Sequence, residues 1–218
     1  MAEITAAQVK QLRDMTGAGM MDSKRALVET GGDIEKAKDY LREHGMARAA
    51  KKAGRSTGEG AIESYVHHAS GVGRVGVLVE VNCESDFVAK TDDFKHLAHE
   101  IALHIAGASP QYVRREEVPA EAIERETAIF RAQVADKPAN VQDKIISGKL
   151  DAFYGEIVLL DQPYIREPKK KVKDLISEAI AKLGENITVA RFARFAVGET
   201  AGAEQESPDG EPAGVAAE

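Results

Sequence analysis

Hydrophobic residues in the first 45 positions recur at intervals of three and four, which is typical of amphipathic helices. Thr5 and Gln8 have the spacing of a capping box, so we expect the first helix to begin after Thr5. Gly17 is placed to end this helix. Its apolar side holds Val9, Leu12 and Met15.

Two more short helices are expected before residue 46. Asp22 is a candidate N-cap for the second helix, which Gly31-Gly32 ends. Asp33 is a candidate N-cap for the third helix, which we expect to end at Gly45. Three helices of this length predict a very small core, near the lower size limit for independent stability.

The hydrophobic period changes to two after residue 60, which indicates strands. Residues 61–68 are expected to form a first strand, and residues 70–73 have the composition of a turn. Alternate positions of residues 74–82 are valine, so one face of that strand is apolar. The two strands together predict a hairpin.

The rest of the chain is mostly helical in pattern. Apolar residues from Phe94 to Ile105 lie on one side of a helix for which Asp92 or Asp93 is the expected cap. Further helices are expected over residues 119–134, 140–160 and 172–183, and a strand over residues 188–197. One hairpin, a block of helices and a late strand predict an α+β fold with a small antiparallel sheet of about three strands.

These patterns divide the chain into four parts. The expected parts are a three-helix module (residues 1–46), a linker (47–60), an α+β core (61–198) and an acidic tail (199–218). The linker mixes basic residues with Gly, Ser and Thr, and its alanine-rich first half can extend as helix. The tail has six acidic residues, no lysine or arginine and no apolar period, so we expect it to be disordered.

Composition indicates a soluble globular protein, with 43% hydrophobic and 30% charged residues. No apolar run approaches the roughly 18 residues that a membrane span requires. The first ten residues lack the basic and apolar segments of a signal peptide. The single cysteine, Cys83, cannot form an intrachain disulfide, which favours a reducing, cytoplasmic compartment.

The formal net charge of −7 is partly an effect of the tail, because the rest of the chain carries 29 basic residues against 30 acidic ones. Two basic stretches, in residues 48–55 and 169–173, could contact phosphate, although solvated helix and linker charges are the simpler interpretation. Aromatic residues are only 5% of the chain, so a broad base-stacking surface is not expected. We therefore expect no nucleic-acid partner.

The sequence contains no convincing motif for nucleotide binding, metal binding or catalysis. Gly71–Gly76 fits G-x-G-x-x-G, but a strand follows it instead of a helix, so we expect a hairpin turn and no direct nucleotide binding. His99 and His104 are five positions apart, which separates their side chains by about 140° around a helix. His96, His99 and Glu100 are then expected on a solvated polar face. We expect no metal, no cofactor and no catalytic residue.

Two segments have the composition of contact loops. Met20 and Met21 follow a glycine-rich turn, and they either fill the small helical core or offer an adaptable apolar contact to a partner. Asp86 and Phe87 lie between a strand and a helix, where Phe87 could protrude as a wedge. In the alternative, which spacing slightly favours, Phe87 folds back over the core and Asp86 caps the following turn.

These segments resemble the bacterial elongation factor Ts family. The similar stretches are VKQLRDMTGAGMMDSKRAL (residues 9–27), GGDIEKA (31–37), AKKAGR (50–55), VLVEVNCESDFVAK (77–90), GKLDAFYGEIVLLDQPYI (148–165) and RFARFAVGE (191–199). The resemblance covers roughly residues 1–199 in order and does not include the acidic tail.

The resemblance implies a guanine-nucleotide exchange factor, with no bond-making chemistry, for the GTPase elongation factor Tu. It implies that the N-terminal module is ubiquitin-associated-like and contacts the nucleotide domain of the GTPase through Arg13, Met20 and Met21. A Thr-Asp-Phe-Val motif of the family, which intrudes beside the Mg²⁺ and phosphate site of the GTPase, aligns with Ser85, Asp86, Phe87 and Val88. Ser85 replaces the usual threonine but keeps the hydroxyl, so we expect any capping role to survive.

Longer members of the family have a duplicated core and a helical hairpin insertion, whereas this chain holds a single core. Short members pair their cores, so the resemblance implies a homodimer. From the residues alone, other classes stay open: a docking module that leaves its partner's ligand unchanged, or a non-catalytic RNA- or ribosome-associated adaptor, suggested by the basic stretches. Stimulated GDP release would distinguish an exchange factor from both.

Overall fold

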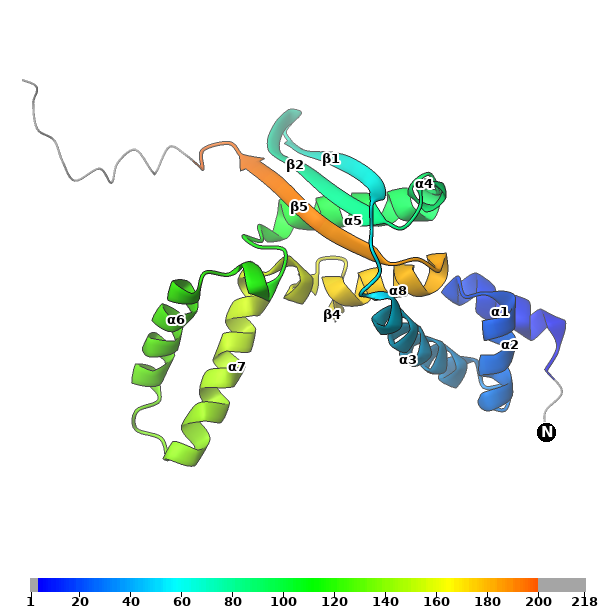
Figure 1. Ribbon diagram of the computed structural model, residues 1–218, viewed down its shortest axis with the longest axis horizontal. Coiled ribbons are helices and arrows are strands. Elements are labelled where there is room, and N and C mark those ends of the chain that lie inside the picture. Colours follow the sequence, from blue (N-terminus) through cyan, green and yellow to red (C-terminus); the bar gives the residue numbers. More distant parts are fainter. Residues whose placement is uncertain (1–3, 200–218) are drawn as a thin grey trace, which may run out of the picture.

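The computed structural model describes residues 4–199, so the expected disordered tail lies outside the described residues except for Glu199. Three parts follow one another along the molecule in Figure 1: a helical module at the N-terminus, a sheet with its covering helices, and a helical hairpin that projects away from the sheet. The fold is α+β, as the sequence predicts.

The N-terminal module contains α1 (Ala6–Thr16), α2 (Met20–Glu29) and the first half of α3 (Ile34–Lys52). Thr5 and Gln8 form the predicted capping box, and Gly17 ends α1 with a left-handed backbone at φ 67°. The buried side chains between the helices are Val9, Leu12, Ala26, Leu27, Ala37 and Leu41. The three predicted helices are confirmed, and the likeness to ubiquitin-associated modules stays a prediction.

Two predicted helix caps are wrong by one or a few residues. α2 begins at Met20, so Asp22 lies in its first turn and is not its N-cap. The N-cap of α5 (Asp92–Ala108) is Thr91, whose hydroxyl accepts a hydrogen bond from the first turn at 3.3 Å, and not Asp92 or Asp93. Both aspartates lie in that first turn, where a negative charge interacts favourably with the helix dipole.

The predicted end of the third helix at Gly45 is also wrong. α3 continues to Lys52, through part of the expected linker. A Cβ at position 45 would lie 3.2 Å from the Cβ of Ala181 on α8 (Val172–Leu183), so Gly45 permits two helices to pack closely. The division into domains at residues 46 and 60 stays a prediction.

The central sheet has the order β1-β2-β5, and both strand pairs are antiparallel. Its strands are β1 (Glu59–Ala69), β2 (Val72–Cys83) and β5 (Ile187–Ala196). The hairpin, the late strand and the small antiparallel sheet are thereby confirmed. Gly60, the second residue of β1, has φ 155°, and a Cβ there would lie 2.3 Å from the carbonyl oxygen of Val81, so a side chain has no room.

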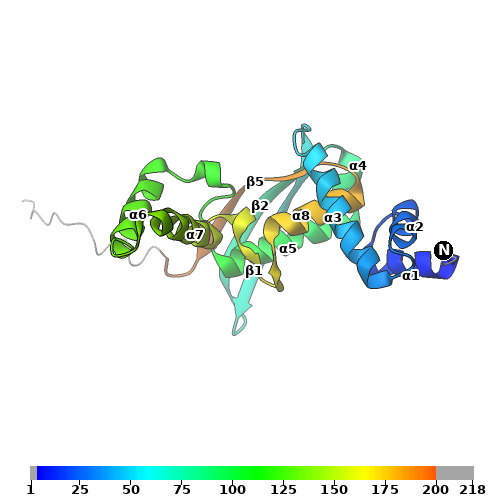
Figure 2. The ribbon, with the colours of Figure 1, turned by 90° about the horizontal axis from the view of Figure 1, so that it is seen from below.

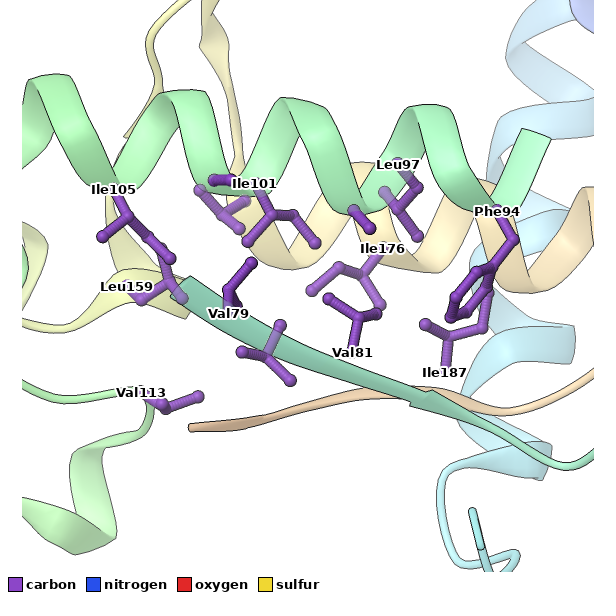
Figure 3. Packing of buried hydrophobic residues seen from close by; sticks show 14 of the residues in the cluster. Val79, Val81, Phe94, Leu97, Ile101, Ile105, Val113, Leu159, Ile176 and Ile187 are labelled. Atoms are coloured by element: carbon purple, nitrogen blue, oxygen red, sulfur yellow. The ribbon is translucent and has the colours of Figure 1, made fainter. Parts of the chain in front are cut away.

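The main core lies between one face of the sheet and the helices α5 and α8 (Figures 1 and 3). Figure 3 shows Val79 and Val81 of β2 directed toward Leu97 and Ile101 of α5. Phe94, at the start of α5, is fully buried. Each such side chain contributes about 1.5–3 kcal/mol when it leaves water. The alternating valines and the apolar side of α5 therefore meet as the sequence predicts.

The helices α6 (Ala120–Gln133) and α7 (Ala139–Ile157) form a hairpin at the end of the molecule opposite the N-terminal module (Figures 1 and 2). Both helices are predicted from the sequence, but their projection from the core is not. Short 3₁₀ turns, Arg115–Glu117 and Leu159–Asp161, flank the pair. A second, unpredicted sheet of β3 (Pro163–Tyr164) and β4 (Glu167–Lys171) leads the chain back to α8.

Candidate functional site

Asp86, Phe87 and Val88 belong to a single helical turn, α4 (Asp86–Ala89), which Glu84 and Ser85 connect to the end of β2. Ser85 is its N-cap, because its hydroxyl accepts a hydrogen bond from the backbone N–H of Val88 at 3.4 Å. Val88 packs against the main core, whereas the side chain of Phe87 is 80% exposed. The alternative in which Phe87 folds back over the core is therefore wrong, and the ring protrudes.

Asp86 forms an ion pair and does not cap the helix. Its Oδ2 accepts a hydrogen bond from Nζ of Lys90, one turn further along, at 2.5 Å. This hydrogen bond holds the pKa of Asp86 below its ordinary value, so the carboxylate stays ionised. The protruding ring of Phe87 is thus presented beside a negative charge.

The loop before α4 is held by residues that sequence reasoning misses. Glu185, in the turn between α8 and β5, accepts hydrogen bonds from the backbone N–H groups of Glu84 and Ser85 at 3.1 and 3.0 Å. Cys83 is buried, as expected, and its thiol donates to the carbonyl of Ser85 at 3.1 Å. The only sequence signal for Glu185 is an acidic residue just after a helix-ending glycine, about 100 positions from the loop.

The three predicted contact residues of the N-terminal module are all on its surface. Arg13 is in the last turn of α1, and Met20 and Met21 form the first turn of α2. Met20 is 46% exposed and Met21 is 71% exposed, so the alternative that both fill the helical core is wrong. Exposed methionine side chains are flexible and polarizable, which suits an adaptable apolar contact.

The two candidate contact regions lie toward the same end of the molecule. In Figures 1 and 2, α4 and the pair α1 and α2 lie on the side away from the α6–α7 hairpin. The element between them is α8, which packs against α3 and carries Glu185 just beyond its end.

The prediction that Glu100 lies on a solvated polar face of α5 is wrong. Its side chain is only 5% exposed; Tyr164 Oη donates to it, and Nε of Arg166 lies 2.5 Å from its Oε2. Burial alone would raise the pKa of Glu100, but the hydrogen bonds from Tyr164 and Arg166 outweigh burial and lower it. Burial and the bond to Glu100 raise the pKa of Tyr164 to about 12. This cluster anchors the β3–β4 hairpin to α5.

Many side chains of the two basic stretches have acidic or carbonyl partners within the chain. Arg48 lies 2.6 Å from Asp22, and Lys52 donates to the carbonyl of Gly184. In the second stretch, the carboxylate partners are Glu167 and Glu178 for Lys170, and Asp161 for Lys171 and Lys173. Positive charge that is paired internally contributes little to nucleic-acid binding.

The G-x-G-x-x-G motif of residues 71–76 lies in the hairpin of β1 and β2. Gly71 lies in the β1–β2 turn and Gly76 lies within β2, so the motif belongs to a hairpin and does not begin a helix. Within residues 4–199, no group of three or more His, Cys, Asp or Glu side chains is arranged to hold a metal ion. Among the same residues, no helix is both long and apolar enough to cross a membrane.

Comparison with known proteins supports the resemblance. The family model described as "Elongation factor TS" matches residues 3–199. An elongation factor Ts of Coprothermobacter proteolyticus is 60% identical over 199 residues, which cover 90% of this chain and 100% of that relative. Proteins of the same name from Caldanaerobacter subterraneus and Herpetosiphon aurantiacus are 59% and 56% identical, with 98% of each relative covered and 90% and 89% of this chain. The chain therefore belongs to the elongation factor Ts family of translation factors.

Proposed function

We propose that this chain is a guanine-nucleotide exchange factor that binds elongation factor Tu with GDP and promotes GDP release, in the cytoplasm, during translation elongation. The observation that carries the proposal is the protruding Phe87, 80% exposed beside the ionised Asp86. Exchange requires coupling free energy and no bond-making chemistry. A factor that binds the nucleotide-free GTPase more tightly than the GDP form lowers the affinity for GDP by the same ratio.

Phe87 acts as a wedge in this proposal. An exposed phenyl ring gains about 1.5–3 kcal/mol when it leaves water for an apolar site. Insertion between helices of the GTPase stabilises the conformation in which those helices are separated. Since that conformation distorts the phosphate site, GDP binds to it more weakly.

Asp86 contributes its charge. Mg²⁺ bridges the nucleotide phosphates to the GTPase, so displacement of the ion removes a large electrostatic stabilisation of bound GDP. A carboxylate brought close to the phosphates opposes them directly. In the free factor this carboxylate is paired with Lys90. The nucleotide and the ion belong to the GTPase, and this chain binds neither.

Arg13, Met20 and Met21 supply binding energy away from the nucleotide. Met20 and Met21 offer exposed thioether side chains, and Arg13 adds a planar cation one helix away. Contacts that are equal in the GDP-bound and nucleotide-free states hold the factor on the GTPase without favouring release. The N-terminal module therefore provides docking, and the α4 loop promotes the displacement of GDP.

The sheet supports a second proposal, that two copies pair through their cores. Within residues 4–199, no element covers the face turned away from α5, and this face carries large exposed apolar residues: Ile62, Val66, Leu78 and Phe195. Phe195 is 73% exposed and lies across Gly76 from Val66, with a hollow over the glycine. Open apolar faces of this kind mark interaction surfaces, and an equivalent face on a second copy is complementary in chemistry.

Release of fluorescent GDP from purified elongation factor Tu, with excess unlabelled nucleotide, tests the exchange function. We expect strong acceleration at substoichiometric amounts of the chain. The variants Phe87→Ala and Asp86→Ala should lower the maximal rate, whereas Met21→Ala should raise the concentration needed for half of that rate. Equal losses of rate and affinity in Phe87→Ala would contradict the wedge, and no acceleration by the wild type would leave a docking module.

A further inference from the structure

The helical turn that presents Asp86 and Phe87 cannot fix its own position. α4 contains four residues, and none of its side chains is buried. A single helical turn is unstable in isolation, because ordering its backbone costs more than its few hydrogen bonds return. Val88 and Ala89 pack against the core on one side of the turn, and contacts at its start fix the direction of Asp86 and Phe87 on the other.

Those contacts converge on one carboxylate. Oε2 of Glu185 accepts the backbone N–H groups of Glu84 and Ser85 at 3.1 and 3.0 Å, and its Oε1 accepts the hydroxyl of Ser85 at 2.6 Å. Hydrogen bonds to an ionised acceptor are stronger than neutral ones. The two amides lie at the end of β2, where the ladder to β1 and β5 stops.

The Ser85 hydroxyl links this carboxylate to α4. It donates to Glu185 and accepts from the backbone N–H of Val88, so the proton of the hydroxyl is directed to the carboxylate and the lone pairs to the helix. A change at Glu185 therefore releases both the loop backbone and the orientation of the N-cap.

A reciprocal contact fixes Glu185 in turn. Oε1 of Glu84 accepts the backbone N–H of Asn186 at 2.6 Å, and Nη1 of Arg55 lies 3.5 Å from the same oxygen. Asn186 is buried, and its side-chain amide Nδ2 donates to the backbone carbonyl of Arg55 at 2.8 Å. Each loop thus holds the backbone of the other through an acidic side chain, and both are tied to the segment after α3.

We propose that Glu185 is a positioning residue for exchange: through Ser85 and the amides before α4, it holds Asp86 and Phe87 in the direction needed to enter the GTPase. This inference rests on the proposed exchange function and deepens it. Glu185 follows Gly184 at the end of α8, which packs on α3, so the same turn also links the α4 loop to the helix that continues from the N-terminal module.

The test compares Glu185→Gln and Glu185→Ala with Glu178→Gln, in full-length protein, by GDP release from elongation factor Tu over a range of factor concentrations. Glu178 is a matched control because it lies on α8 and pairs with Lys170, away from the loop. Since misplacement by about 1 Å costs a positioned group roughly 100-fold, we expect Glu185→Ala to lower the maximal rate 10- to 100-fold with little change in half-saturation. Glu185→Gln, which keeps one acceptor oxygen, should fall in between.

Variants of Ser85 distinguish a positioning role of Glu185 from general destabilisation of the protein. If Glu185 acts through the hydroxyl, Ser85→Ala and Glu185→Gln combined should lower the maximal rate much less than the product of their separate effects. Ser85→Thr, which keeps the hydroxyl, should lower the rate much less than Ser85→Ala does. Hydrogen exchange of the amides of residues 84–88 should increase in Glu185→Gln, while the amides of α5 stay protected.

The outcomes separate this inference from the exchange function itself. Failure of the wild type to accelerate release overturns the proposed function. Wild-type acceleration together with a maximal rate within about twofold of wild type in Glu185→Gln and Glu185→Ala overturns the positioning role. A loss confined to half-saturation, or an equal loss in Glu178→Gln, also overturns it. If Glu185→Ala does not fold, Glu185→Gln and the Ser85 variants decide.

Discussion

Two phenylalanines seven positions apart have opposite environments, and the difference decides what each contributes. Phe87 protrudes from α4, whereas Phe94 is fully buried beneath the sheet. We expect Phe87→Ala to change the free energy of unfolding by no more than about 0.5 kcal/mol, because the ring is already in water. Phe94→Ala should cost about 3–5 kcal/mol through the lost burial and the cavity.

Urea unfolding of the two variants followed by circular dichroism measures both effects. A Phe87→Ala variant that is destabilised as strongly as Phe94→Ala would show that the ring is part of the core. Combined with the GDP-release assay, near-wild-type stability and a reduced maximal rate would assign Phe87 to the partner and not to the fold.

His104 makes the stability of the core depend on pH. The residue is fully buried; its Nδ1 accepts the backbone N–H of Ile165 at 3.2 Å, so the neutral ring donates from Nε2 to Gln162 at 2.9 Å. Burial lowers the pKa of His104 from 6.5. The unfolded chain therefore binds the proton first, and the stability contributed by neutral His104 is complete above about pH 6.5 and is lost as pH falls through the folded-state pKa.

We expect the free energy of unfolding to fall between pH 7 and pH 5 by at most about 1.4 kcal/mol per pH unit on account of this group. His104→Gln should be less stable at pH 7 but lose less on acidification. Exposed His68, changed to Gln, is the control. Parallel pH profiles for wild type and His104→Gln, measured by urea unfolding, would contradict the assignment.

At the scale of elements, the contact between α3 and α8 joins the N-terminal module to the core. Gly45 faces Ala181, with room for no more than a tight Cβ. Gly45→Val adds a branched side chain there, and we expect it to destabilise the protein by about 1–3 kcal/mol through overpacking. Ala181→Gly in the same chain removes the opposing methyl and should restore part of that loss.

A thermal or urea double-mutant cycle over Gly45→Val and Ala181→Gly measures the coupling. Strictly additive effects would mean that the two positions do not meet. Increased proteolysis of residues 53–58 in Gly45→Val alone would place the loosening at the junction between α3 and β1.

The same contact shows where sequence reasoning succeeds and where it stops. Alternating valines, helical spacing and the capping box at Thr5 depend on neighbours within a few positions, and they predicted the sheet and most of the helices. Gly45 looks like a helix end because only its local sequence is visible; the Ala181 methyl that explains it is 136 positions away. Glu100 fails as a prediction for the same reason, since Tyr164 and Arg166 cover it from a distant hairpin.

Some residues of the candidate site could be found from the sequence, and others could not. Asp86, Phe87, Met20 and Met21 could be singled out from sequence because apolar side chains next to glycine or carboxylate are unusual in loops. Their exposure could not be determined, since spacing alone allowed both a buried and a protruding Phe87. Glu185 was missed because its partners, the amides of Glu84 and Ser85, become neighbours only when β5 pairs with β2.

At the scale of the whole molecule, the elements within residues 4–199 cover only one face of the sheet. The helices α5 and α8 bury the side that carries Val79 and Val81, while the other side leaves Leu78 and Phe195 in solvent. A three-stranded sheet with one open apolar face gains stability by packing against another surface. A second copy offers the same face, so pairing about a twofold axis can bury both at once.

Sedimentation velocity at micromolar concentration measures this pairing. We expect a dimer for the wild type and a monomer for Leu78→Asp and Phe195→Asp, because each variant places an unpaired carboxylate in the proposed interface. Ile129→Asp is the matched control, since Ile129 is an exposed apolar residue on α6, outside the sheet. A wild-type monomer, or dimers that persist in both sheet variants, would contradict pairing through this face. If the monomeric variants still accelerate GDP release per chain, each copy carries a complete docking module and wedge, and pairing serves the stability of the sheet and not the exchange step.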